Sequence, residues 1–243
     1  LAPFVFHRGV GRLADVARPK LHVLRVVLLT LETALFYAAV VYLPLADVMS
    51  FYMAGPIYVA ALSHFMLGER IGWRRWSAIL LGFVGVLIIL QPSTASATSV
   101  GTIYAVLGSL LFALTIVLNR MLRATSDTTM VTWQMIGTLL FGGALSLFGW
   151  TTPSPVQVGL LLLLGIVACL AHMMITRALK LAPASTLAPL HYTLLLWAAV
   201  LGWAFFGDVP GPNVLIGSAI VVFAGLFIVH RQKVVEGVPK ENV

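Results

Sequence analysis

The sequence predicts an all-α integral membrane protein, a polytopic helix bundle that forms one transmembrane domain over residues 1–243. Three observations predict this class. Hydrophobic residues make up 60% of the chain and charged residues only 9%, against about 25% charged in a soluble domain. Apolar stretches long enough to cross a bilayer recur along the whole sequence, and the mean hydropathy is +1.01. A water-soluble fold needs a polar shell that this composition does not supply.

The same composition excludes several other classes of protein. A disordered chain would be poor in apolar residues, and a disulfide scaffold would need more than the single cysteine, Cys169. The net charge of +7 does not indicate a nucleic-acid binder, because the basic residues recur at predicted helix ends and do not gather in one patch. We therefore expect no nucleic-acid partner.

A transmembrane helix needs about 20 apolar residues to cross about 30 Å of hydrocarbon. By this measure the chain contains eight complete spans, separated by short joints rich in proline and glycine, which interrupt helices. The predicted spans cover residues 22–43, 45–67, 72–91, 100–120, 128–150, 157–178, 184–206 and 212–230. No joint is long enough to hold a soluble domain.

The two ends of the chain are expected to lie outside these spans. Residues 1–6 are apolar but too short to cross a membrane, and charge follows them instead of preceding them, which is unlike a signal peptide. We expect residues 1–21 to hold the end of a truncated span and a cytoplasmic loop, and residues 231–243 to form a cytoplasmic tail.

The charged residues predict the orientation of the bundle. With eight alternating spans, all 15 Lys and Arg residues fall on one side of the membrane, and the opposite joints carry only the acids Asp47 and Asp208. Because cytoplasmic loops are enriched in Lys and Arg, the basic side and the C-terminus are predicted to be cytoplasmic.

The chain also contains an internal repeat. When the sequence is aligned with itself, one constant offset matches Pro44 with Pro183, Gly68 with Gly207, and Glu69 with Asp208. The remainder of an N-terminal repeat covers residues 22–91 and a C-terminal repeat covers 99–230. Since the offset spans five predicted helices, an odd number, the two copies must be inverted. Inverted repeats are typical of alternating-access transporters, whose substrate sites lie near the bilayer midplane.

Several stretches resemble the EamA-type family of the drug/metabolite transporter superfamily. They are FYAAVVYLPLADVMSFYMAGP (36–56), LGER (67–70), GFVGVLIIL (82–90), LAPASTLAPLHYTLLLWAAVLGWAFFGDVPGP (181–212) and GSAIVVFAGLFIV (217–229). The resemblance implies a ten-helix bundle with cytoplasmic termini, in which two inverted five-helix repeats surround a central cavity. The first helix and most of the second are absent from this sequence.

The resemblance also implies which spans line that cavity and where the protein resides. The first, second, fourth, sixth and seventh spans are expected to face the cavity, and the third and eighth to be peripheral. The implied location is the cytoplasmic (inner) membrane of a bacterium.

Glu32 is the most informative single residue. It lies 12 residues before Pro44, about 18 Å along a helix from the outer joint and so near the bilayer centre. An ionisable group at that depth costs about 2.5 kcal/mol or more, so it normally faces a cavity or a partner. Glu32 could carry protons or bind a polar substrate group; a structural pair with Arg25 is the alternative. Phe36, one turn further, would extend the same face.

Two histidines are the next candidates for the substrate site. His191, at the position that matches Tyr52 in the repeat, and His172, close to the position that matches Glu32, both lie deep in predicted spans. A neutral imidazole can donate and accept a hydrogen bond. A bond between helices is the structural alternative. The other candidates lie near these residues or could stack on a ring: Thr176, Tyr192 and Trp197, together with Tyr52 itself.

Three other features are expected to be structural. Glu69 and Asp208 lie at membrane edges and are predicted to organise the start of the next helix. Pro56 is predicted to kink the second span.

The sequence contains neither GxxxxGK[ST] nor HExxH, so we expect no nucleotide-driven pump, no metal site and no cofactor.

The leading hypothesis is a secondary active transporter, not an enzyme, that moves a small metabolite or drug-like solute across the cytoplasmic membrane by alternating access. Its partners would be that solute, the lipid bilayer and protons as the coupling ion, with a homodimer left open. Two alternatives remain at this stage. One is a membrane-embedded enzyme that uses Glu32 and His172 as an acid–base pair on a lipid-phase substrate, and the other is a non-transporting truncated relative.

Overall fold

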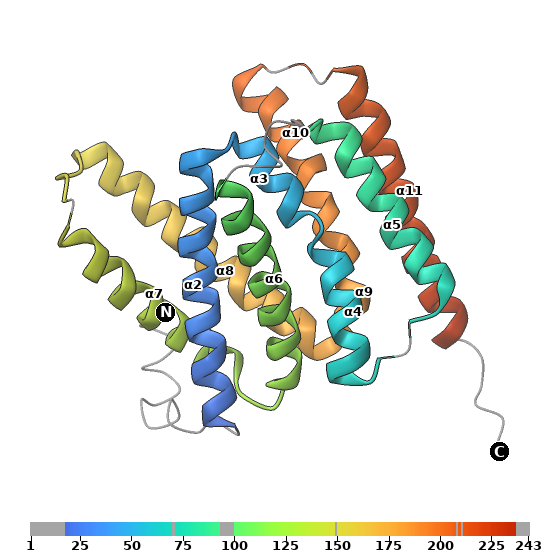
Figure 1. Cartoon of the computed structure of the whole chain (residues 1–243), viewed down its shortest axis with the longest axis horizontal. Coiled ribbons are helices and arrows are strands. Elements are labelled where there is room, and N and C mark those ends of the chain that lie inside the picture. Colours follow the sequence, from blue (N-terminus) through green and yellow to red (C-terminus); the bar gives the residue numbers. More distant parts are fainter. Residues whose placement is uncertain are drawn as a thin grey trace.

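The computed structural model describes residues 18–69, 71–92, 100–148, 150–207, 209 and 211–236, and within them every regular element is a helix. The elements appear in Figure 1 and are α2 (Pro19–Tyr42), α3 (Leu45–Tyr52), α4 (Gly55–Leu67), α5 (Trp73–Leu90), α6 (Val100–Met121), α7 (Asp127–Ser146), α8 (Pro155–Leu181), α9 (Ala184–Leu187), the 3₁₀ helix η3 (Ala188–Tyr192), α10 (Thr193–Phe206) and α11 (Pro212–Glu236). Residues 1–17, most of the predicted truncated span and loop, lie outside the described part, as do residues 237–243 of the predicted tail.

The predicted membrane class is confirmed: this is a polytopic, all-α membrane protein. Six helical segments in the described part are long and apolar enough to cross a bilayer: Pro19–Tyr42, Asp47–Leu67, Trp73–Leu90, Val100–Met121, Pro155–Leu181 and Ala184–Phe205. Pro212–Phe227 is a shorter apolar helix. Helix α7 occupies the predicted span 128–150 but is not among the six, and buried polar side chains such as Thr128, Thr132 and Gln134 make its first half less apolar.

The sequence encodes several helix ends locally. The Ser154 hydroxyl accepts a hydrogen bond from the Gln157 amide (3.3 Å), and the Gln157 side chain accepts one from the Ser154 amide (2.8 Å), so α8 begins with a capping box. Ser126 caps α7 by accepting from the Thr129 amide at 3.1 Å. Helix α11 continues to Glu236, beyond residue 230 where the last predicted span ends.

The same backbone geometry recurs at the matched positions of the two repeats. Pro44 precedes α3 with φ −54° and ψ 143°, and Pro183 precedes α9 with φ −56° and ψ 143°. Gly68 ends α4 with φ 67°, and Gly207 ends α10 with φ 74°, a left-handed conformation that favours glycine. These recurrences support the internal repeat found in the sequence.

Two of the spans are discontinuous at equivalent places. The second predicted span breaks between α3 and α4 at Met53–Ala54, and Pro56 lies in the first turn of α4. The seventh is split into α9, η3 and α10. Near Pro56, where a kink was predicted, Met53 and Ala54 keep right-handed helical angles, but the Ala54 and Ile57 amides donate to carbonyls three residues back instead of four. Broken helices at membrane depth are tolerated where the backbone is enclosed by protein or lines a cavity.

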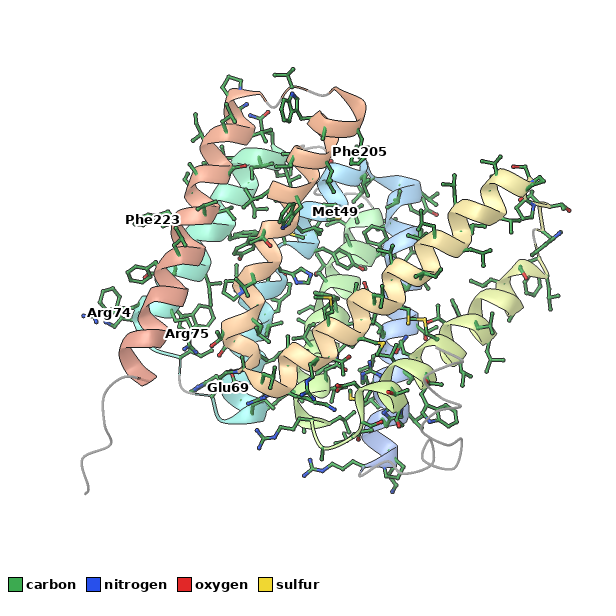
Figure 2. The ribbon with its side chains drawn as sticks, turned by 180° about the vertical axis from the view of Figure 1, so that it is seen from behind. Met49, Glu69, Arg74, Arg75, Phe205 and Phe223 are labelled. Atoms are coloured by element: carbon green, nitrogen blue, oxygen red, sulfur yellow. The ribbon has the colours of Figure 1, made fainter. Side chains whose placement is uncertain are left out.

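Helices α5 and α11 pack together at one edge of the bundle, where they also contact η3 of the seventh span (Figure 1). Their contact depends on glycine, because a Cβ added to Gly217 would lie 2.5 Å from the Gly85 carbonyl oxygen. The peripheral position expected for the third and eighth spans is what the structure shows. Phe223 points outward from α11 in Figure 2.

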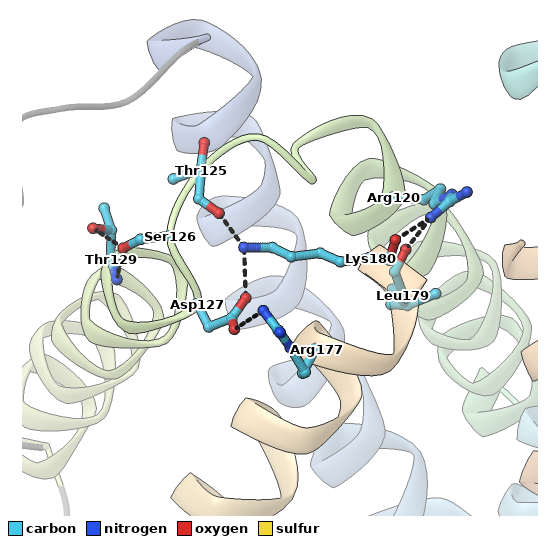
Figure 3. A network of polar contacts seen from close by, with 8 residues as sticks. All are labelled: Arg120, Thr125, Ser126, Asp127, Thr129, Arg177, Leu179 and Lys180. Atoms are coloured by element: carbon cyan, nitrogen blue, oxygen red, sulfur yellow. Dashed lines mark hydrogen bonds and ion pairs between the residues drawn. The ribbon is translucent and has the colours of Figure 1, made fainter. Parts of the chain in front are cut away.

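One end of the bundle carries the basic side chains, and we call it the basic end. It holds the start of α2, the α4–α5 joint, the α6–α7 joint and the end of α8. There Asp127 pairs with Lys180 (2.5 Å) and with Arg177 (3.7 Å), and the Lys180 ammonium also donates to the Thr125 carbonyl (Figure 3). Arg120 donates to the Leu179 and Lys180 carbonyls at 2.7 and 2.9 Å. These contacts fasten α8 to the joint between α6 and α7.

Candidate functional site

A cavity of about 210 Å³ lies between α4, α6, α8 and the broken segment α9–η3. Its lining is apolar except for one imidazole. The lining residues are Gly55, Pro56, Val59, Phe112, Ile116, Ile175, Ala178, Leu179, Leu187, Ala188, Leu190 and His191. The second, fourth, sixth and seventh predicted spans therefore line this cavity. The first, α2, is not among the elements that line it.

The imidazole of His191 is the polar group in the cavity wall. It lies in η3, where the seventh span is interrupted, and its ring packs against Phe112 of α6 with centroids 5.0 Å apart and planes tilted by 57°. Within the described residues its ring nitrogens have no hydrogen-bond partner. A neutral imidazole carries one donor and one acceptor, so both remain available to a molecule in the cavity.

Phe112 also contacts Tyr52, the residue that matches His191 in the first repeat. The Tyr52 ring lies 6.3 Å from Phe112, and Phe36 meets Tyr52 edge-on at 5.2 Å. Because Tyr52 and His191 are matched by the repeat, equivalent positions of the two copies contact the same ring on α6. A continuous row of aromatic side chains thus runs from α2 to the cavity.

Glu32 lies behind this row on α2. Its side chain is only 8% exposed, and its carboxylate lies 3.4 Å from the Thr33 hydroxyl, which donates at 2.9 Å to the Leu29 carbonyl. The Tyr52 hydroxyl donates to the Glu32 backbone carbonyl, also at 3.4 Å. The expected alternative, a pair with Arg25, is not present: Arg25 donates to the Asn119 side chain and to the Met130 carbonyl (3.2 Å). Glu32 is therefore a buried carboxyl with hydroxyl neighbours and no ion pair within the described residues.

The other predicted site residues lie apart from the cavity. The His172 imidazole bonds to the Ala168 carbonyl of its own helix (2.9 Å). Thr176 is buried on α8 beside the lining residue Ile175. The Tyr192 hydroxyl donates to the Ile79 carbonyl of α5 at 3.2 Å. Trp197 is 62% exposed on α10.

At the basic end, Glu69 joins the α4–α5 joint to the start of α9. Its carboxylate accepts hydrogen bonds from the Ala184 and Ser185 amides, both at 3.1 Å, and from the Ser185 hydroxyl at 2.5 Å. Arg75 donates to the same hydroxyl at 3.0 Å. Figure 2 shows Glu69 and Arg75 near each other at this end of the molecule. We call this set the Glu69 link. Glu69 was predicted to organise the start of the next helix, which is α5, but its hydrogen bonds are to the start of α9 in the other repeat.

Sequence reasoning missed Phe112, because aromatic residues in spans are more often packing residues than ligand contacts. Its position in the fourth span, which the resemblance placed at the cavity, was the available signal. It also missed Ser185 and Arg75, which acquire their role only when distant segments meet at the Glu69 link.

A polytopic helix bundle with a small central cavity between discontinuous helices is the architecture of a membrane transporter. The model of the EamA-like transporter family matches residues 1–91 and 99–230, and the chain belongs to this family. A solved structure with 16% sequence identity superimposes with a TM-score of 0.83, over 96% of this chain and 83% of the other, and so shares the fold.

Named relatives align with most of the chain. An S-adenosylmethionine uptake transporter of Rickettsia felis is 30% identical over 236 residues, which cover 96% of this chain and 79% of the relative. A riboflavin transporter of Rhizobium johnstonii is 29% identical, with 95% and 76% covered. A pseudopaline exporter of Pseudomonas aeruginosa is 27% identical, with 82% and 70% covered. The relatives are thus named as transporters of small metabolites.

Proposed function

We propose that the protein is a secondary active transporter that moves a small metabolite across the cytoplasmic membrane of a bacterium by alternating access, and that it is not an enzyme. The observation that carries the proposal is the cavity between α4, α6, α8 and η3, two of whose walls are formed where spans are interrupted. Transporters place their substrate at such interruptions, near the midplane and between repeats. The named activities of the relatives support the same class.

Alternating access requires two halves that move against each other. We propose that these are two inverted repeats, 22–91 and 99–230, and that the basic end faces the cytoplasm. Two sets of contacts join the repeats: an apolar cluster that includes Val117 and the lining residues Val59 and Leu179, and the Glu69 link at the basic end. In the proposed cycle these contacts close the cytoplasmic side and must separate to open it.

Glu32 is the proposed proton carrier. Its carboxyl is buried at mid-span and has no cationic partner in the part of the chain that the structure describes, so its charged form is costly and its protonation is sensitive to what surrounds it. Tyr52 lies between Glu32 and Phe112, which lines the cavity. A solute that displaces the aromatic row would alter the surroundings of Glu32, and this would couple solute binding to proton movement.

The proposal is tested by comparing metabolites inside and outside cells that express the full-length wild type, the Glu32→Gln variant or the Asp127→Asn variant, at matched membrane levels. Asp127→Asn removes a carboxylate that is paired at the basic end and does not line the cavity, and it serves as the control. We expect one compound to redistribute with the wild type and with Asp127→Asn, and its pH-driven accumulation to be lost with Glu32→Gln.

Two other outcomes would change the proposal in different ways. If Glu32→Gln accumulates the compound under a pH gradient as the wild type does, transport stands and Glu32 is not the proton carrier. If no compound redistributes with any of the three proteins, in rich as well as in minimal medium, the transport function itself is wrong.

A further inference from the structure

The cavity combines an apolar wall with a single polar edge. Of the twelve lining residues, His191 alone has a polar side chain, and none carries a formal charge. Glu32 lies behind Tyr52 and is not among the lining residues, and neither is any other acid. A charged group of a solute would therefore lose its hydration here without gaining a counter-ion, which is unfavourable.

Two rings form one side of this cavity. Phe112 and His191 lie 5.0 Å apart with their planes tilted by 57°, and Tyr52 supports Phe112 from behind. Aliphatic side chains, among them Val59, Ile116 and Ile175, form the rest of the wall. A flat ring inserted between them could stack on an aromatic face and contact aliphatic carbon on its other face. Aromatic pairs gain a further stabilisation beyond the burial of area.

The imidazole adds a requirement for a hydrogen bond. His191 has no protein partner for its ring nitrogens among the described residues, so a solute without a donor or acceptor would leave it unpaired in an apolar site. Sites built around one buried polar group reject analogues that cannot pair with it far more strongly than analogues that merely differ in size.

The size of the cavity restricts the solute further. At about 210 Å³ it is smaller than the roughly 300–1,000 Å³ of a pocket for a whole drug-sized ligand. It therefore suits one or two fused rings, and any polar remainder of the solute must lie outside this cavity.

We propose that Phe112 and His191 select solutes that carry an uncharged, planar heteroaromatic ring, which stacks on Phe112 and forms a hydrogen bond with His191. This inference rests on the proposed transport function and names its substrate class. It assigns a specificity role to Phe112 and a ring-edge contact to His191.

The test measures binding of small probes to the full-length protein in nanodiscs, and so does not depend on transport. The matched probes are 2-naphthamide and its fully saturated analogue, which share an amide and differ in aromaticity; lumichrome and adenine serve as heteroaromatic ring probes. We expect the naphthamide to bind about three- to tenfold more tightly than the saturated amide, the range that stacking supplies. Phe112→Leu should remove this preference, and His191→Phe should weaken lumichrome and adenine by about tenfold.

Phe223→Leu, on the exposed face of α11, is the control and should bind all probes as the wild type does (Figure 2). The inference is overturned if the saturated amide binds as well as the aromatic one, or if Phe112→Leu and Phe223→Leu have equal effects. Either result leaves the transport function intact, because that function is judged by metabolite redistribution. Conversely, ring selection in nanodiscs together with no redistribution in cells would overturn transport alone.

Discussion

At the scale of single residues, Tyr52 connects the two parts of the candidate site. Its ring contacts Phe36 and Phe112, and its hydroxyl lies against the backbone of Glu32. The hydroxyl has room only because residue 108 is glycine: an added Cβ would lie 2.3 Å from the Tyr52 oxygen and 3.1 Å from its Cζ. The position of Tyr52, and through it that of Phe112, thus depends on the absence of one methyl group in α6.

This dependence predicts that Gly108→Ala lowers the free energy of unfolding by about 1–3 kcal/mol, as overpacking does, and also impairs transport. Combining it with Tyr52→Phe, which removes the clashing oxygen, should recover part of the stability. Thermal unfolding in detergent measures both variants. Gly142→Ala is the matched control, since nothing lies within 4 Å of its added Cβ and alanine favours a helix. Equal effects of Gly108→Ala and Gly142→Ala would contradict the prediction.

At the scale of elements, the short helix α9 is organised by a residue from the other repeat. Glu69 accepts hydrogen bonds from two amides at the first turn of α9, where backbone donors have no partner within the helix. Ala184 and Ser185 are fully buried, so these donors cannot turn to water. The start of α9 and the α4–α5 joint are therefore held together by hydrogen bonds that water cannot replace.

We predict that Glu69→Ala lowers the free energy of unfolding by about 1–3 kcal/mol, because it leaves buried donors unpaired, and that Glu69→Gln, which keeps one acceptor, lowers it less.

If the Glu69 link also closes the basic end, the Leu187→Cys side chain, on the cavity wall, should react faster with an impermeant maleimide in the Glu69→Ala background. Denaturant unfolding and labelling rates in a Cys169→Ala protein measure the two effects. An unchanged stability in Glu69→Ala would refute the first prediction, and an unchanged labelling rate the second.

At the scale of the whole molecule, large apolar side chains cover the outside of the bundle. None of the apolar stretch of α8 is buried within the described part, and large hydrophobic side chains such as Leu160, Leu164 and Trp203 are exposed. In a bilayer, contact with lipid tails replaces contact with water, so this exposure carries no penalty. The charged side chains instead gather at the basic end, where Asp127 and Lys180 pair.

The proposed orientation predicts which joints face each side of the membrane. Helix α7 separates two exposed positions, Arg123 at the basic end and Thr152 at the other. In a Cys169→Ala background, we expect an impermeant maleimide to label Thr152→Cys in intact cells and Arg123→Cys only after the membrane is permeabilised. The reverse pattern of labelling would show that the basic end faces outward.

The amino-acid sequence by itself determined the class of protein and the approximate positions of six spans, and it predicted an internal repeat. These properties follow from composition, from hydropathy over windows of about 20 residues and from proline and glycine at joints, all of which are local. For the same reason the ends of α4 and α10, at Gly68 and Gly207, could be matched before any contact was known. Glu32 was singled out because depth in the membrane can be counted along one helix.

Only the tertiary structure decided which side chains meet. His191 and Tyr192 are adjacent in η3, yet His191 lines the cavity and Tyr192 bonds to α5, and the sequence does not show which neighbouring helix each would meet. Phe112 and Ser185 gain their roles from contacts with segments that are distant in the chain. Such contacts depend on how helices pack, which is set by the shapes of all the side chains together and not by the properties of any one segment.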